Sequence, residues 1–371
     1  MDLQNRYKWF SSKLPRIFIM LTVVGLGICS VYIFVIYRVE SAIKFNLLSK
    51  KNTESVFNFL QKLVPNLGFQ SNSSLGSVPD SKWNEYMGLN VTGKLNLLVR
   101  EKASMTDPRL IDLIRKYYIE PPAEKPYALK NPVTLDYSCG QSSYIDRFFN
   151  SMENGFFIEA GAWLGEYAST SLFFEKSRGW SGLLIEPNPE NFLQLKKLNR
   201  KAFHIRACLS THPFPVLLKL NSASDMSRIV ERREDEQWVQ EHNFENKPYY
   251  EVPCFPLYSI MLAMNRSSID YFGLDVEGNE LLVLQTIPFN DFDIKSLSAE
   301  CLNMNDKGRD HAVAVKTYLE SKGFICNGVI GPNPIHGCFA EDLVFLKKDL
   351  ASKELKCELV KSPFSFWDNK R

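Results

Sequence analysis

Apolar runs and stretches with a helical period alternate along this chain from about residue 136 onward. Such an alternation of strands and helices favours an α/β domain with a mainly parallel sheet and helices on its faces. Strands are predicted at 155–160, 182–186, 202–208, 214–220, 270–275, 295–301, 323–330 and 342–347. Helices are predicted at 141–150, 167–177, 189–199, 279–286 and 310–322.

The last two predicted strands, 323–330 and 342–347, are joined by a loop too short for a helical crossover. We therefore expect them to be antiparallel neighbours at one edge of the sheet. A further segment, 228–247, carries many charges of both signs. It is predicted to be a solvated helix or flap, and a lid over the functional site is the alternative.

One long apolar run precedes this pattern. The run from Ile17 to Tyr37 carries no charge, and it is long enough to cross a bilayer as a helix. A cleaved signal peptide is the alternative, but the run exceeds the usual apolar segment and no small-residue cleavage site follows it. Lys and Arg are about equally common on both sides, so the positive-inside rule does not decide the orientation. The short tail and large C-terminal part favour a single-pass type II membrane protein of the endoplasmic reticulum or Golgi.

This prediction divides the chain into five parts. The region before the α/β domain includes a Ser/Asn/Gly/Pro-rich linker at 70–80, and Asp107-Pro108 there is a helix start signal. The predicted parts are a cytosolic tail at 1–16, a transmembrane signal anchor at 17–37, a lumenal stem with short helices at 38–135, an α/β domain at 136–350 and a C-terminal tail at 351–371.

A glycine-containing turn follows the first strand of the α/β domain. Gly161 and Gly165 follow that strand, and the next strand ends in Glu186. Glycines after one strand and an acid after the next are typical of folds that bind an adenosine. The spacing is neither the three-glycine dinucleotide fingerprint nor a P-loop, so an adenosine ligand without phosphates fits better. S-adenosylmethionine is the common one, and its carboxylate could lie at the following helix N-terminus.

The predicted cofactor site takes in residues of the turn and of the second strand end. The alternative is an ordinary α/β turn that needs small residues. The predicted cofactor-binding residues are Glu159, Gly161, Ala162, Gly165, Glu186 and Asn188.

A second group of acids follows a later strand. Asp275 and Glu277 end the strand at 270–275, and Glu300 lies near the end of the strand at 295–301. The carboxyl ends of parallel strands meet at one edge, so these acids should converge on the crevice of the glycine turn. Asp275 and Glu277 are the predicted catalytic residues. Such carboxylates could deprotonate a hydroxyl, orient a substrate or hold a divalent metal. No residue is assigned as a metal ligand. Alternatively, one of the two acids caps the helix at 279–286.

Charge, cysteines and glycosylation signals bear on partners and compartment. The net charge of +2 makes nucleic acid a poor partner. Asn72, Asn90 and Asn265 begin glycosylation triplets. No C-x-x-C motif is present and the histidines do not cluster with the cysteines, so a zinc site is not expected. In an oxidising lumen Cys326 with Cys338 and Cys208 with Cys254 are the expected disulfides; buried free thiols in a reducing compartment are the alternative.

Three motifs carry a resemblance to a known family. Residues 157–162, 179–188 and 269–278 resemble the FkbM family of S-adenosylmethionine-dependent methyltransferases, and the likeness extends over 138–347. The resemblance implies a class I methyltransferase fold and methyl transfer to a hydroxyl, often on a sugar or polyketide-like acceptor. The apolar run, the stem and residues 252–259 are similar to a membrane-anchored animal branch, which is associated with export of membrane-bound growth-factor precursors.

The chain departs from the family pattern at three positions. Leu164 stands where an acid usually precedes the second glycine, and Thr170 lies where an Asn is usual. Ser142 follows Gly-Gln in place of an acid. Loss of an acid at the cofactor edge should weaken its contacts by about 1.5–3 kcal/mol.

Two hypotheses of different class follow. The first is a lumenal methyltransferase that acts on a glycan or small-molecule acceptor, with S-adenosylmethionine held by Glu159, Gly161 and Glu186. Asp275 or Glu277 would then position or deprotonate the acceptor hydroxyl. The second is a catalytically inactive protein of the same fold. It would bind a growth-factor precursor client in vesicle-mediated transport from the endoplasmic reticulum to the Golgi.

Overall fold

The computed structural model describes residues 79–301, 306–331, 341–350 and 357. They belong to one compact unit that spans Asn72–Arg371. None of the helices within these ranges is long and apolar enough to cross a bilayer. The predicted signal anchor at 17–37 and the cytosolic tail before it lie outside the described residues.

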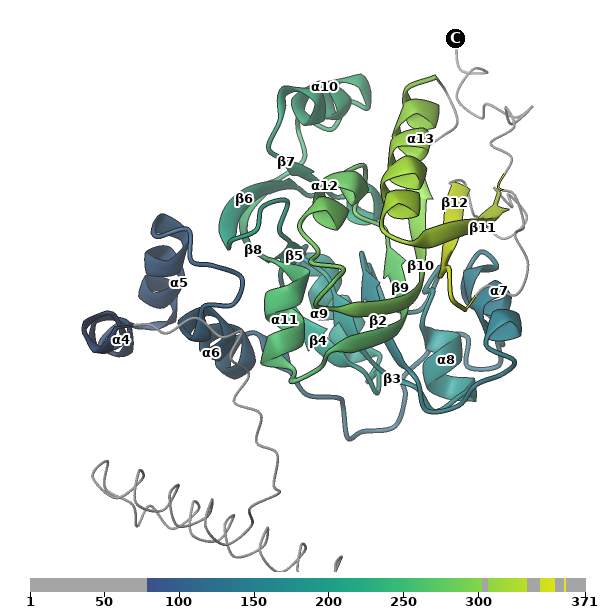
Figure 1. Cartoon of the computed structure of the whole chain (residues 1–371), viewed down its shortest axis with the longest axis horizontal. Coiled ribbons are helices and arrows are strands. Elements are labelled where there is room, and N and C mark those ends of the chain that lie inside the picture. The colour runs from purple at the N-terminus through teal and green to yellow at the C-terminus, as the bar shows by residue number, and fades with distance from the viewer. Residues whose placement is uncertain (1–78, 302–305, 332–340, 351–356, 358–371) are drawn as a thin grey trace, which may run out of the picture. The chain divides into compact units, whose positions relative to one another are not determined.

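The main sheet of the unit is mixed. Its central strands β4, β3, β2, β9 and β10 are parallel, whereas β12 is antiparallel to both of its neighbours and β1 is antiparallel to β4. The prediction of a mainly parallel sheet whose last two strands are antiparallel at one edge is therefore confirmed. From one edge to the other the strands are β1 (Ile119–Glu120), β4 (Phe203–Ile205), β3 (Ser181–Ile185), β2 (Phe156–Ala160), β9 (Ser268–Leu274), β10 (Asp293–Cys301), β12 (Glu341–Lys347) and β11 (Phe324–Ile330) (Figure 1).

Helices cover both faces of this sheet because successive side chains of its buried strands point to opposite faces. Phe157 packs in a cluster with residues of α7 (Gln141–Phe148), α8 (Leu172–Ser177) and α9 (Pro189–Lys197). Ile158, the next residue of β2, packs in a second cluster with residues of α6 (Pro108–Tyr117), α11 (Leu257–Ala263), α12 (Glu280–Gln285) and α13 (Asp306–Ser321). Both apolar layers are buried, which explains why these strands read as continuous apolar runs.

Helix α8 differs from the prediction in a way that matters for the site. It begins at Leu172 and not at residue 167. Residues 163–171 form an irregular segment between the glycine turn and the helix. The expected helix N-terminus beside the turn, where a ligand carboxylate could bind, is therefore absent from this position.

A second, four-stranded sheet is inserted between β4 and β9. Its order is β5 (Cys208–Leu209), β8 (Tyr249–Phe255), β6 (Val216–Asn221) and β7 (Arg228–Val230). The predicted strand at 202–208 is split, because β4 ends in the main sheet and β5 begins the second one. A disulfide joins Cys208 to Cys254 across the β5–β8 pair, as expected.

Other predictions for this part of the chain are refined or wrong. Segment 228–247 contains β7 and α10 (Arg233–Glu241). Cys326 forms its disulfide with Cys357, so the expected Cys326–Cys338 pair is wrong. Cys326 lies inside β11 and does not border the following loop, and the Cys357 sulfur lies 3.3 Å from the Gly328 carbonyl oxygen of the same strand.

Three helices precede the α/β part: α4 (Asp80–Met87), α5 (Val91–Arg100) and α6. The Asp107 carboxylate caps α6, with Pro108 at its first position, as the sequence indicated. Arg115 of α6 donates hydrogen bonds to the Leu262 and Ala263 carbonyls at the end of α11. These bonds join the helices to the face of the main sheet that α11 covers.

Candidate functional site

A cavity of about 530 Å³ lies at the carboxyl ends of the central strands. It opens where the strand order reverses between β2 and β9, the position at which open α/β sheets bind ligands. Its volume is within the range of small-molecule sites. The second sheet and the loop 224–227 also contribute to its wall, whereas α10 does not, so the lid alternative gains no support.

The glycine turn forms one side of the cavity. Gly161 has a φ of +87°, and a Cβ placed on it would lie 1.9 Å from the Asp275 carbonyl oxygen. Gly165 has a φ of +79°, and its Cβ would lie 3.0 Å from Leu195. Gly161 and Ala162 line the cavity, but Gly165 does not. The two glycines are therefore required by contacts within the chain, whether or not a ligand is bound.

Glu186 lies at the rim of this side, 4% exposed. One carboxylate oxygen accepts a hydrogen bond of 2.7 Å from the Trp163 amide of the turn, and the other accepts one of 2.9 Å from the Asn188 amide. Burial raises the pKa of Glu186 to about 8. A carboxylate has about four acceptor positions, so two remain for a ligand hydroxyl.

Glu159 lines the same side but is engaged by the chain itself. Its carboxylate accepts hydrogen bonds from the Thr170 amide at 2.8 Å, the Ser169 hydroxyl at 2.9 Å and the Ser171 hydroxyl. Both serines also accept bonds from the fully buried Arg200. Burial raises the pKa of Glu159, and the Arg200 charge opposes that shift. The carboxylate thus holds the segment 169–171 in place.

Asn188 does not reach the cavity. Its side-chain oxygen caps α9 by accepting from the Glu190 amide at 2.9 Å, and its amide group donates to Ser222 and Ser227 at 2.9 Å each. These bonds join the end of β3 to the loop after β6. All the polar atoms of this side chain have partners, so its position is explained by the fold.

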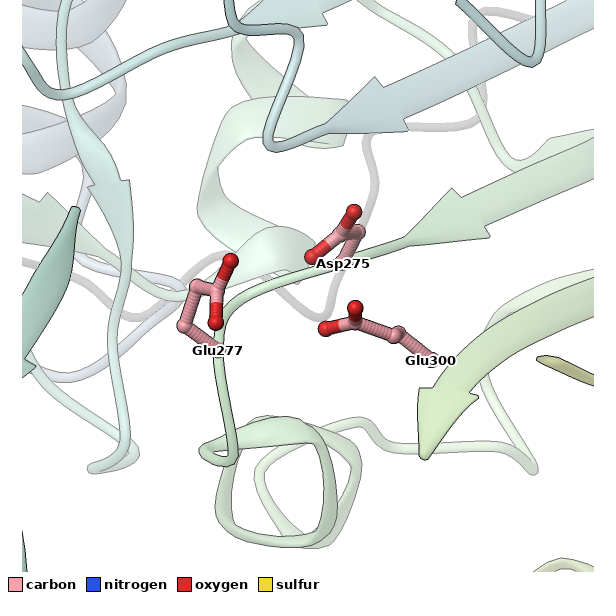
Figure 2. Close-up of side chains that lie close together, drawn as sticks. All are labelled: Asp275, Glu277 and Glu300. Carbon is pink, nitrogen blue, oxygen red and sulfur yellow. The ribbon is translucent and has the colours of Figure 1, made fainter. Parts of the chain in front are cut away.

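The three acids expected at the far side do converge. Figure 2 shows Asp275, Glu277 and Glu300 pointing toward one another from the ends of β9 and β10. One carboxylate oxygen from each lies within 4.8 Å of the others. All three line the cavity, and we call them the acid cluster. Asp275 is exposed to the cavity, whereas Glu277 and Glu300 are only 8% and 7% exposed.

The electrostatics of the acid cluster are unfavourable for three ionised groups. Burial is the largest cause in each case, and neighbouring carboxylates add to it. The pKa of Asp275 rises to about 7. The pKa values of Glu277 and Glu300 are raised well above their usual range. One oxygen of Glu277 and one of Glu300 are buried without any hydrogen-bond partner.

Helix α12 is not capped by either predicted acid, so that alternative is wrong. Glu280 accepts hydrogen bonds from the amides of Val276 and Gly278 at 3.0 and 3.1 Å. Its other oxygen lies 2.9 Å from His311 Nε2. Because Glu280 closes the turn before the helix, the Glu277 carboxylate is left for the cavity. Glu277 itself has a φ of 55°, an uncommon conformation for a residue other than glycine.

The three departures from the family pattern differ in position. Thr170 lines the cavity, and its hydroxyl is buried without a partner. Ser142 is buried and donates to the Thr170 carbonyl, and Leu164 is partly buried; neither lines the cavity. The argument from the loss of an acid therefore applies to none of the three positions, because the two lost acids lie outside the cavity and Thr170 replaces an Asn.

Two buried features of the site gave no recognisable sequence signal. Arg200 follows a predicted helix and stands among other polar residues, so its side chain would be expected to be exposed. It is instead fully buried and donates a 3.0 Å hydrogen bond to Glu175. Asp342, on β12 between β10 and the edge strand β11, lines the cavity and accepts a 2.6 Å bond from Gln141. Burial raises the pKa of Asp342 to about 6.

A comparison with protein-family models identifies a known domain in this chain. Residues 159–326 match the model of the methyltransferase FkbM domain, which confirms the family resemblance for this part of the chain. The matched segment contains the glycine turn, Glu186 and the acid cluster. No curated protein matches this chain.

Solved methyltransferase structures have a similar arrangement at low identity. The plantazolicin methyltransferase BpumL in complex with SAH is 13% identical, and the match covers 69% of this chain and 98% of that chain with a TM-score of 0.32. A protein described as an rRNA methylase from Clostridium thermocellum is 11% identical, with 58% and 100% covered and a TM-score of 0.30. At these TM-scores the likenesses assign neither the fold nor any residue role.

Proposed function

We propose that this protein is an S-adenosylmethionine-dependent methyltransferase that acts on a hydroxyl. The observation that carries the proposal is the division of the cavity into two chemically different sides. The glycine-turn side offers backbone groups and Glu186, and the opposite side offers the acid cluster. The match of 159–326 to the methyltransferase FkbM domain supports this reading.

On the glycine-turn side, Glu186 is the residue proposed to accept the ribose hydroxyls of the cofactor. Its carboxylate is fixed by the amides of Trp163 and Asn188, so it is oriented before a ligand arrives. Gly161 and Ala162 bring backbone groups to the cavity wall beside it. Glu159 and Asn188 are proposed to act indirectly, by holding the loops around the cofactor.

On the opposite side, Asp275 is proposed to receive the acceptor proton. In the transfer, the acceptor oxygen bonds to the methyl carbon, the carbon–sulfur bond breaks, sulfur loses its positive charge and the hydroxyl proton passes to Asp275. A pKa of about 7 suits a general base near neutrality. Most of the rate enhancement would come from alignment of the oxygen, methyl and sulfur, which needs few catalytic groups.

The proposal is tested by calorimetry of the full chain with S-adenosylmethionine and with S-adenosylhomocysteine. We expect one site per chain, and Glu186→Ala should weaken binding roughly tenfold to a hundredfold. Glu153→Ala, an exposed acid outside the cavity, is the matched control. Absence of binding at millimolar ligand, with folding intact, would overturn the cofactor assignment.

We further propose a location in the secretory pathway as a type II membrane protein with the domain in the lumen. The disulfides Cys208–Cys254 and Cys326–Cys357 support this, since disulfides persist mainly in oxidising compartments. Alkylation of unreduced protein from cells, followed by mass spectrometry, tests it. Free thiols at these four cysteines would argue against a lumenal domain.

The alternative function is client binding without chemistry, as in the membrane-anchored animal branch that includes the protein Star. The engagement of Glu159 and Asn188 within the chain favours it, because two expected cofactor contacts serve the fold alone. A Glu186→Ala, Asp275→Ala double variant discriminates between the two functions. If that variant restores export of a growth-factor precursor in cells lacking the protein, the chemistry is not required there.

A further inference from the structure

The acid cluster has more negative charge than the chain compensates. Burying a carboxylate without a partner is costly, and such groups are usually paired with a cation or bound to a metal. Glu277 and Glu300 each keep one buried oxygen without a partner. Both oxygens belong to side chains that Figure 2 shows pointing into the space shared with Asp275.

No basic side chain in the described ranges forms an ion pair with the cluster. The Arg228 charge lowers the pKa of Glu277, but two of its guanidinium nitrogens donate to Asp235 at 2.9 and 3.2 Å, and the third is buried without a hydrogen bond to the cluster. His311 is paired with Glu280. Asp342, Glu280 and Asp225 add further negative charge around the cluster. The nearby residues therefore increase the demand for a bound cation.

The geometry suits a divalent ion with oxygen ligands. Six to eight oxygens surround such an ion at about 2.0–2.6 Å, so opposite ligands are about 4–5 Å apart. The cluster oxygens lie within 4.8 Å of one another, inside this span. They come from the ends of two adjacent paired strands, β9 and β10, which fix their spacing. Carboxylate ligands alone favour magnesium, manganese or calcium over zinc or copper.

We propose that Asp275, Glu277 and Glu300 bind one divalent cation of this class. Because Asp275 is exposed to the cavity, the coordination positions that the protein leaves open face the space where an acceptor would lie. Resting on the proposed function, the cation would bind the acceptor hydroxyl and lower its pKa, and the Asp275 oxygen that does not bind the cation would receive the proton. Cation binding itself depends on the three carboxylates and needs no cofactor.

The competing explanation is that protons replace the cation. The cluster would then stay partly protonated at neutral pH and bind no metal. The two explanations differ in one measurable respect, which is whether a stoichiometric ion binds to protein that contains neither cofactor nor acceptor.

The test is a titration of the metal-free full chain with Mn²⁺ alone, followed by calorimetry and by the electron paramagnetic resonance signal of free Mn²⁺. We expect one ion per chain, and at least a tenfold loss of affinity in Glu300→Gln and in Glu277→Gln. Glu153→Gln should bind Mn²⁺ as the unchanged chain does. Mg²⁺ or Ca²⁺ added in excess should displace Mn²⁺.

Two results would overturn the proposal. One is the absence of stoichiometric Mn²⁺ binding to folded protein, and the other is binding that neither Gln variant weakens. Both variants keep the side-chain size, and circular dichroism and thermal unfolding check their folding. Failure of the cation site is separable from failure of the proposed function, because cofactor calorimetry without metal measures the glycine-turn side independently.

Discussion

Both sides of the cavity contain buried carboxylates, but the two sides differ in how many hydrogen bonds the chain donates to them. On the glycine-turn side, Glu159 accepts three hydrogen bonds and Glu186 accepts two, all from within the chain. In the acid cluster, Glu277 and Glu300 are similarly buried, yet each has an oxygen without a hydrogen-bond partner. Carboxylates with partners contribute to the fold, whereas buried carboxylates without partners add a cost that a ligand can remove.

This difference in hydrogen bonding distinguishes Glu159 and Glu186 from Glu277 and Glu300, which a sequence motif alone does not. Each of the four acids follows or belongs to a strand that ends at the same edge, and a residue pattern does not show which of them are satisfied within the chain. Only the donors around each carboxylate distinguish them. The contrast leads to four expectations about substituted proteins.

The largest effect is expected where the two sides touch. Gly161→Ala should lower the free energy of unfolding by at least about 4 kcal/mol, because the new Cβ would overlap the Asp275 backbone as well as strain a φ of +87°. Gly323→Ala is a matched control, since its φ is +89° and nothing lies within 4 Å of its Cβ. It should cost only about 1–2 kcal/mol. Urea unfolding measures both, and equal losses would show that the backbone contact is unimportant.

Next in size is the loss of a carboxylate that has all its partners. Glu159→Gln should destabilise the protein by about 2 kcal/mol. The substitution replaces one acceptor oxygen with an NH₂ group, which would face groups that already donate hydrogen bonds. Urea unfolding at pH 7.5 measures the change, with the exposed Glu153→Gln as control. A Glu159→Gln protein as stable as the unchanged chain would contradict a structural role for this carboxylate.

The third effect concerns ligand binding and its pH dependence. The ionised form of Glu186 is the better acceptor for ribose hydroxyls, and the pKa of this residue is about 8 in the free protein. Affinity for S-adenosylmethionine should therefore rise severalfold from pH 7 to pH 9, and Glu186→Gln should remove most of that rise. Calorimetry at the two pH values measures it. The same slope in both proteins would mean that another group titrates.

The smallest effect has the opposite sign to the second. In metal-free protein at pH 7.5, Glu300→Gln should stabilise the fold by about 1 kcal/mol, because it removes a buried carboxyl group whose ionisation burial and the neighbouring carboxylates oppose. Adding Mn²⁺ should raise the melting temperature of the unchanged chain and have less effect on the variant. A destabilised metal-free variant would mean that Glu300 is satisfied in the fold.

The sign of the pH effect on stability follows from the same groups. The folded-state pKa of Asp275 is about 7, above its ordinary 3.8, so the folded chain binds more protons than the unfolded chain between these values. Its contribution to stability is therefore fully present below pH 4 and declines as the pH rises toward 7. Asp342, with a pKa of about 6, acts in the same direction. Glu300→Gln should make this decline shallower.

Much of the main sheet could be predicted from the sequence, because β2, β3, β9 and β12 are mostly buried and predominantly apolar. The second sheet was largely missed. Strand β8 contains a glutamate and a proline and is half exposed, so its pattern resembles a loop. The Cys326–Cys357 pair depends on the path of the chain after β12, and no local spacing reports it.

The candidate site was predicted in part for a related reason. Strand ends are visible in a sequence, so the convergence of Asp275, Glu277 and Glu300 could be expected from sheet geometry alone. Hydrogen-bond partners come from segments distant in the chain, such as Ser222 and Ser227 for Asn188. Which carboxylates have hydrogen-bond partners and which do not could therefore not be predicted from the sequence.

The contact between Gly161 and Asp275 has a consequence for how two ligands would share the cavity. The Asp275 amide donates a 3.0 Å bond to the Ala160 carbonyl, and the Gly161 backbone lies directly against the Asp275 carbonyl. A displacement of the turn by a cofactor would thus move a ligand of the proposed cation. Thermodynamic reciprocity then requires each to alter the affinity of the other by the same factor. The backbone contact between Gly161 and Asp275 would then set the cooperativity between cofactor binding and cation binding.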